Sequence, residues 1–96
     1  MKIFVSEKAK TDLLRIYAYL ADRNPLAADA LIEEIDNKFG NLCRFPFIGR
    51  ERSSLAPGLR SILVGTYVIF YLIDRDRIVI VRMIDGRMDI DEEFKR

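Results

Sequence analysis

The dipeptide Asn24-Pro25 divides the first half of the chain into two helical segments, and this limits the possible folds more than any other feature. Asparagine caps a helix well, and proline at the first helical position loses no useful hydrogen-bond donor. Apolar residues recur at steps of three and four from Ala9 to Leu20 and from Ala28 to Leu42. Polar residues of the first segment, Asp12 among them, are expected away from this apolar face. Two amphipathic helices with so short a link predict an antiparallel hairpin.

The rest of the chain reads mainly as strands. A short strand is predicted before the helices, and three longer ones follow them, rich in β-branched and aromatic residues. Their expected ranges are 2–5, 59–64, 67–73 and 77–84. Because Gly65-Thr66 and residues 74–76 form tight turns, the last three strands should make an antiparallel meander. Residues 45–58, which carry all but one of the prolines, are predicted to form a long ordered loop.

These elements predict the fold class. It is α+β, in the order β-α-α-β-β-β, with an N-terminal strand and a two-helix hairpin packed on a small antiparallel sheet. A length of 96 residues predicts one domain over residues 1–96. The strand 67–73 is apolar on both faces, so one face is left for the C-terminal tail, for a partner, or for both. Residues 89–96 should form a short helix or fray.

The residues that the chain lacks exclude several kinds of chemistry. It has no histidine and a single cysteine, Cys43, which excludes imidazole catalysis, an internal disulfide and a multi-cysteine metal site. It also has no glycine-rich phosphate-binding motif, so we expect no cofactor and no metal. Cys43 continues the apolar stripe of the second helix and is predicted to pack there. The apolar runs are too short for a signal peptide or a membrane span, which predicts a cytoplasmic protein.

A cluster of arginines with one glutamate is the main functional candidate. Residues 44–60 carry a net charge of +3, although the whole chain carries only +1. The cluster contains Arg50, Glu51, Arg52, Arg60, Arg82 and Arg87. Arg60 enters the first strand of the meander and Arg82 lies near the end of the last, so the sheet could bring them together. Two alternatives remain open: the arginines could hold phosphate with Glu51 as a base, or Glu51, Asp85 and Asp89 could pair with them in a structural network.

Motifs along nearly the whole chain resemble those of one known family. They are Ala9-x-x-Asp12-Leu13-x-x-Ile16, Tyr19, Pro25, Ala28, Leu42-x-x-Phe45-Pro46-x-x-Gly49, Leu59-Arg60, Tyr67-Val68-Ile69-Phe70-Tyr71 and Arg82-x-x-Asp85-Gly86-Arg87-x-Asp89. In this order they are similar to the ParE branch of the RelE/ParE toxin superfamily. The resemblance implies a bacterial type II toxin that a cognate ParD-like antitoxin neutralises. It also implies DNA gyrase as the target, and contact with DNA only through the antitoxin.

The resemblance also bears on whether the protein is an enzyme. Toxins of the RelE branch cut messenger RNA on the ribosome, using basic residues of the sheet and a C-terminal Tyr or His. Arg60 and Arg82 match the arginine positions, but no Tyr or His follows Tyr71. We therefore expect a non-enzymatic inhibitor. The alternatives are a ribosome-dependent ribonuclease with Glu51, Arg60 and Arg82 as its groups, and a non-toxic binding module.

The ParE branch commonly has His-Gly-Arg-Arg where this chain has Asp85-Gly86-Arg87-Met88. The residues expected to contact the target or the antitoxin are Arg50, Arg52, Arg60, Arg82 and Arg87. Among them, Arg60 is expected to act chiefly on stability. Arg87 is expected to act chiefly on toxicity or antitoxin affinity.

Overall fold

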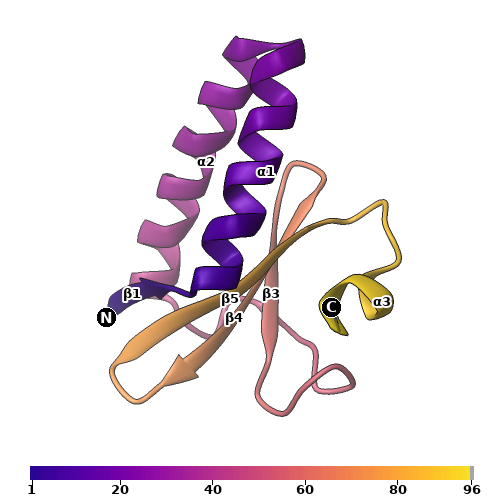
Figure 1. The fold of residues 1–96 in the computed structure, drawn as a ribbon. Coiled ribbons are helices and arrows are strands. Elements are labelled where there is room, and N and C mark those ends of the chain that lie inside the picture. The colour runs from indigo at the N-terminus through magenta and orange to yellow at the C-terminus, as the bar shows by residue number, and fades with distance from the viewer. Residues whose placement is uncertain (96) are drawn as a thin grey trace.

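A computed structural model describes residues 1–95, so Arg96 of the predicted tail lies outside the described part. The elements in chain order are β1 (Lys2–Val5), α1 (Glu7–Arg23), α2 (Pro25–Arg44), β2 (Arg50–Glu51), β3 (Arg60–Val64), β4 (Tyr67–Asp74), β5 (Arg77–Asp85) and α3 (Ile90–Lys95). Figure 1 shows α1 and α2 side by side as a hairpin above one end of the sheet. The α+β class and the predicted order of the long elements are confirmed. The tail forms a short helix.

Capping side chains set the limits of the helical hairpin. The Ser6 hydroxyl accepts a hydrogen bond from the Ala9 N–H at 3.1 Å and so caps α1. Asn24 ends α1 through its own N–H, which donates to the Leu20 carbonyl, and it caps α2 by accepting from the Ala27 N–H at 3.2 Å. One residue thus closes the first helix and opens the second, which keeps the link short and the helices antiparallel.

The sheet has five strands in the order β1-β5-β4-β3-β2. β3, β4 and β5 form the predicted antiparallel meander, with a bulge in the β4–β5 pairing at Phe70 and Tyr71. Two features differ from the sequence prediction. β1 pairs in parallel with β5, so the sheet is mixed, and β2 is an additional short strand within the predicted loop that pairs only with Arg60 and Ser61.

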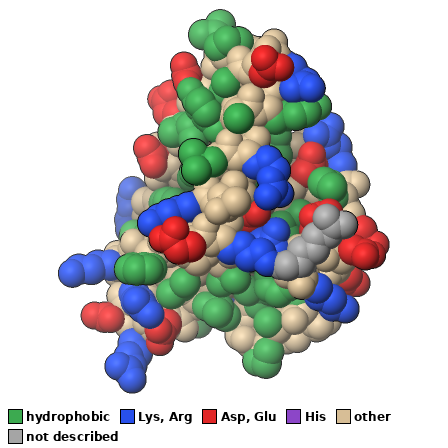
Figure 2. Space-filling model, viewed as in Figure 1, with side chains coloured by type: hydrophobic (Ala, Val, Ile, Leu, Met, Phe, Trp, Pro, Cys, Tyr) green, Lys and Arg blue, Asp and Glu red, His purple; other side chains and the backbone are tan. Residues whose placement is uncertain are grey.

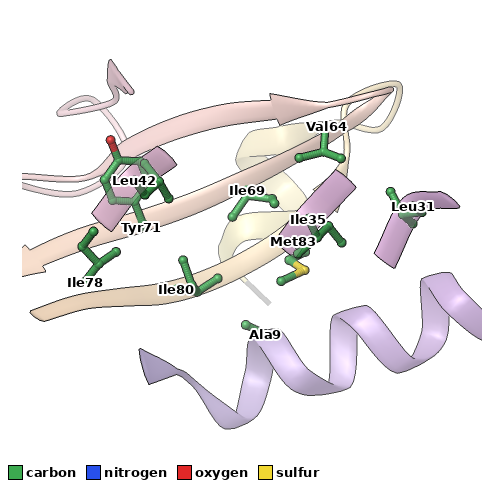
Figure 3. Close-up of a cluster of buried hydrophobic side chains, with 10 residues drawn as sticks. All are labelled: Ala9, Leu31, Ile35, Leu42, Val64, Ile69, Tyr71, Ile78, Ile80 and Met83. Atoms are coloured by element: carbon green, nitrogen blue, oxygen red, sulfur yellow. The ribbon is translucent and has the colours of Figure 1, made fainter. Parts of the chain in front are cut away.

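Two clusters of buried side chains cover the two faces of the sheet. The larger one lies between the helices and the sheet and contains Ala9, Leu31, Ile35, Leu42, Val64, Ile69, Tyr71, Ile78, Ile80 and Met83, as Figure 3 shows. The smaller one contains Leu59, Val68, Phe70 and Ile84, with Ile90 and Phe94 packed against it. The rings of Phe70 and Phe94 lie 5.2 Å apart. The C-terminal helix therefore covers the second apolar face, one of the two coverings predicted.

No helix among the described residues combines the length and the apolar character that crossing a membrane requires. Cys43 is half-buried and not in a disulfide.

Candidate functional site

Arg82, one of the predicted contact residues, is buried in an ion pair with Asp12. Its side chain is 7% exposed and that of Asp12 is 5% exposed. The Arg82 Nε donates to Asp12 Oδ2 at 2.7 Å, and Nη2 donates to Oδ1 at 3.2 Å. Nη1 donates to the backbone carbonyls of Glu93 at 2.7 Å and Phe94 at 3.3 Å. All three nitrogens of the guanidinium are thus engaged within the protein, and Arg82 links α1, β5 and α3.

Asp12 corrects the sequence prediction, which placed it away from the apolar face of the first helix. Position 12 is three residues after Ala9 and four before Ile16, so the helical period puts its side chain on the same face. β1 pairs with β5 only as far as Ile80, and beyond that point Asp12 Oδ2 accepts the Met83 N–H at 3.0 Å. A carboxylate at a buried helical position needs a buried cationic partner. Treating Asp12 as buried would therefore have indicated an arginine such as Arg82 as its partner.

Arg60 holds the loop that connects α2 to β2. Its Nη1 donates to the carbonyls of Gly49 at 2.8 Å and Phe47 at 3.2 Å, and its guanidinium lies 5.1 Å from the centre of the Phe47 ring. Nη2 lies 3.4 Å from Glu51 Oε1. The Glu51 carboxylate is well exposed, whereas the Arg60 side chain is mostly buried. This is one of the pairs expected from a structural network.

Tyr71 of β4, which lies directly opposite Arg60 in the sheet, holds the same loop. Its hydroxyl donates to the Pro46 carbonyl at 2.7 Å and accepts the Gly49 N–H at 2.9 Å. A Cβ at position 49 would lie only 2.3 Å from the Tyr71 hydroxyl oxygen, so only glycine fits. Burial raises the pKa of Tyr71, although the Gly49 hydrogen bond and the charge of Arg60 oppose this shift. The proline and glycine of the Pro46-x-x-Gly49 motif are both held by one tyrosine.

Arg60 and Arg82 do not form one site. Arg60 is directly opposite Tyr71 in the β3–β4 pairing, and Arg82 is directly opposite Phe70 in the β4–β5 pairing. Opposite residues share a face of the sheet, whereas consecutive residues such as Phe70 and Tyr71 point to opposite faces. The sheet does bring the two positions to either side of β4, as predicted. Their side chains lie on opposite faces, because the positions differ by one step of the strand alternation, so the two arginines do not gather in one cluster.

Arg50 and Arg52 lie at the edge of the sheet that β2 forms. The Arg52 Nε donates to the Ser61 hydroxyl at 2.9 Å, and its guanidinium lies 5.7 Å from the centre of the Phe70 ring. Arg50 is exposed in β2. Both line a groove of about 370 Å³ that also includes Lys38 of α2.

Arg87 is an exposed arginine that pairs with Asp85. Its side chain is 70% exposed, and its Nη2 lies 2.7 Å from Asp85 Oδ2 while its Nε donates to Oδ1 at 3.0 Å. These hydrogen bonds lower the pKa of Asp85 and raise that of Arg87. Asp89, the third expected partner of the arginines, instead accepts the Glu92 N–H and caps α3. Arg87, Tyr19 and Tyr67 line a second cavity of about 310 Å³.

The surface charges are interspersed. On the face shown in Figure 2, Lys and Arg side chains lie beside Asp and Glu side chains and exposed hydrophobic groups. Within residues 1–95, no group of three or more His, Cys, Asp or Glu side chains is placed to hold a metal ion.

Comparison with known proteins places this fold and sequence in one family. Residues 3–90 match the family described as the ParE toxin of the type II toxin-antitoxin system, parDE. ParE3 of Caulobacter vibrioides is 36% identical over 80 residues, which cover 82% of this chain and 80% of that protein. ParE1 of Mycobacterium tuberculosis is 26% identical over 95 residues, 97% of each chain.

Two solved structures share the fold. A structure of the chromosomal ParDE system from P. aeruginosa matches with a TM-score of 0.74 at 23% identity, covering 88% of this chain and 95% of that one. The toxin-antitoxin complex RelBE2 from Mycobacterium tuberculosis matches with a TM-score of 0.61 at 30% identity and the same coverage. Because the family match extends over residues 3–90 and ParE3 is similar over most of the chain, this protein belongs to the ParE toxin family of type II toxin-antitoxin systems, within the RelE/ParE superfamily.

Proposed function

We propose that this ParE-family toxin inhibits DNA gyrase by binding it, without catalysing a reaction, and that a ParD-like antitoxin neutralises it in the cytoplasm. It would approach DNA only through that antitoxin. Residues 1–96 would form one toxin domain that needs no cofactor. The single observation that carries the non-enzymatic part of this proposal is the enclosure of Arg82 by Asp12 and the C-terminal helix.

A ribonuclease needs cationic groups free to hold the scissile phosphate and a base within reach of the attacking hydroxyl. The Arg82 guanidinium already donates hydrogen bonds to Asp12 and to two backbone carbonyls. Glu51 lies next to Arg60, which itself holds the loop after α2. To bind RNA, Arg82 would have to leave a buried carboxylate unpaired, which costs about 3–5 kcal/mol.

Membership of the ParE toxin family supports an antitoxin as the partner. The matched family is described by a toxin-antitoxin system, and two related toxins were solved as such systems. The exposed arginines, Arg50 and Arg87 above all, are the proposed contacts with gyrase or antitoxin, because their guanidinium groups remain open to solvent. Arg52, Arg60 and Arg82 would then act mainly by shaping the surfaces around them.

A RelE-like ribonuclease is the second candidate, favoured by the 30% identity to the toxin-antitoxin complex RelBE2. One experiment distinguishes it from the proposed function. The purified chain is added to a gyrase supercoiling reaction and, separately, to a translation reaction with a labelled message. Inhibited supercoiling with an intact message supports gyrase inhibition, whereas codon-specific cleavage supports the ribonuclease. A well-folded chain that does neither and does not arrest growth would be a non-toxic binding module.

A further inference from the structure

The sheet ends at β1 in an open strand edge. Figure 1 shows this strand at the margin of the molecule, next to the N-terminus. The Ser6 N–H donates to the Ile80 carbonyl of β5 at 3.0 Å, so it faces into the sheet. Alternation along the strand then turns the backbone groups of Phe4 toward β5 and leaves the N–H and C=O of Ile3 and Val5 facing outward. Within residues 1–95, no strand pairs with them on that side.

The side chains of β1 differ between its two faces. Ile3 and Val5 pack against the core beneath the helices, whereas Phe4 is 58% exposed on the other face. The Arg77 guanidinium lies 5.2 Å from the centre of the Phe4 ring. Lys2 is exposed on the same face as Phe4. An unpaired strand edge that carries an exposed aromatic ring is a ready template for another strand.

The edge is complementary to itself in one antiparallel register. With a two-fold axis at Phe4, Ile3 of each copy lies opposite Val5 of the other, and each of these pairs exchanges two hydrogen bonds. The two Phe4 residues then face each other as a non-hydrogen-bonded pair, the kind whose side chains lie closest. Aromatic residues in such cross-strand pairs stabilise a sheet. Because a two-fold arrangement closes on itself, two copies satisfy both edges.

The charges along the edge favour a second copy as its occupant. In this register Lys2 lies opposite Ser6 of the second copy, and the exposed carboxylate of Glu7 follows directly after that serine. Like charges are therefore not placed opposite each other along β1. The other edge of the sheet differs, because Arg50 and Arg52 line one groove there and pairing two copies would bring these cations together.

We propose that two copies of this chain associate through β1, with Phe4 at the two-fold axis, and join their five-stranded sheets into one. The inference goes beyond the proposed function and depends on neither gyrase nor the antitoxin. Because β1 has only four residues, the interface belongs to the small and weak class. We expect a dissociation constant between about 10 μM and 1 mM.

A single cysteine on the axis tests the register directly. In a Cys43→Ser background, Phe4→Cys should form a disulfide-linked dimer on air oxidation, because the facing Cα atoms would lie about 4.5 Å apart. Lys2→Cys in the same background is the matched control. Its two cysteines would lie four residues apart along the paired strands, about 14 Å, which is too far for a disulfide. Phe4→Cys should therefore cross-link at least tenfold faster than Lys2→Cys.

Sedimentation equilibrium under reducing conditions tests the association itself. The wild type should shift toward the dimer as its concentration rises to about 1 mM. Phe4→Glu, which places two carboxylates opposite each other, should weaken the dimer at least tenfold and leave the fold intact. Leu14→Glu changes another exposed apolar residue, 71% exposed on α1, and should leave the association unchanged. Val5→Pro removes an outward N–H and should weaken the dimer more than Val5→Thr, which keeps it.

Two results would overturn this inference. The first is a wild type that stays monomeric at about 1 mM, with Phe4→Cys cross-linking no faster than Lys2→Cys. The second is a dimer that persists in folded Phe4→Glu, which would assign the association to another surface. If Val5→Pro unfolds, the cysteine pair and Phe4→Glu still decide, because Phe4 and Lys2 are exposed. Gyrase inhibition and antitoxin binding are measured separately, so either outcome leaves the proposed function to its own test.

Discussion

Asp12 and Arg82 form a buried, two-pronged ion pair that joins the first helix to the last strand across 70 positions of sequence. The same carboxylate accepts the Met83 N–H, and the same guanidinium holds the end of the C-terminal helix. Arg82 matches an arginine position of the ribonuclease branch, but here its side chain stabilises the fold by joining α1, β5 and α3.

Removing one charge of this pair should be costly, because the other charge stays buried without a partner. We expect Asp12→Asn to lower the free energy of unfolding by about 3–5 kcal/mol, as measured by urea denaturation. Arg82→Gln should have a similar effect. The double variant removes both charges and keeps an acceptor for the Met83 N–H, so its loss should be smaller than the sum of the single losses. Additive losses would mean that the two side chains do not interact.

Arg60→Ala should lower stability by about 2 kcal/mol, because it removes charge-assisted hydrogen bonds to the Gly49 and Phe47 carbonyls. Thermal unfolding measures the loss. Arg50→Ala, in the exposed strand next to it, is the matched control and should change stability by less than about 0.5 kcal/mol. Equal stability of both variants would show that Arg60 does not hold the loop.

Gly49→Ala should destabilise the protein by about 1–3 kcal/mol, since the new Cβ would collide with Tyr71. Combining it with Tyr71→Phe removes the nearest atom but leaves a ring carbon that the Cβ would approach to 2.6 Å, so the relief should be partial. Denaturant titrations of the two single variants and the double variant measure this coupling. A fully stable Gly49→Ala would contradict the close approach.

Tyr71 should also contribute to the alkaline stability profile. Its pKa is raised in the folded state, so its contribution is complete below the unfolded value of about 10 and is lost as the pH rises through the folded value. Wild-type stability should therefore fall above about pH 10 more steeply than that of Tyr71→Phe. Parallel profiles of the two proteins, measured by thermal unfolding, would show that the Tyr71 hydroxyl is not the group responsible.

Arg87→Ala should leave stability at neutral pH nearly unchanged, because the Arg87 side chain is 70% exposed, and should weaken antitoxin or target binding. Arg87 lowers the pKa of Asp85. The pairing therefore stabilises the fold above the unfolded carboxyl pKa of about 4 and is lost as the pH falls through the lower folded value. The variant should lose less stability in acid than the wild type. An unstable variant with full toxicity would reverse the expected role.

Local chemistry made much of the fold predictable. Asn24-Pro25 ends one helix and starts the next, and Gly65-Thr66 closes the hairpin, so neighbouring residues alone define both motifs. The parallel pairing of β1 with β5 joins distant segments and leaves no local turn signal. β2 is too short to show an alternating pattern.

The candidate site was less predictable for the same reason. The pairs of Arg60 with Glu51 and of Arg87 with Asp85 join residues that are close in sequence, and charge alone indicated them. The partner of Arg82 lies in the first helix, and it could have been found only by treating Asp12 as buried. The bulge at Phe70 and Tyr71, which changes the register near Arg82, has no clear sequence signature.

The central claim, that Arg82 braces the fold and performs no chemistry, is tested most directly by the toxicity of Asp12→Asn/Arg82→Gln. Growth arrest and inhibition of gyrase supercoiling are measured at a temperature where circular dichroism shows that the double variant is folded. We predict activity within about threefold of the wild type, because the exposed surface is unchanged and threefold corresponds to less than 1 kcal/mol. A folded double variant that binds the antitoxin normally but has lost all toxicity would contradict the account.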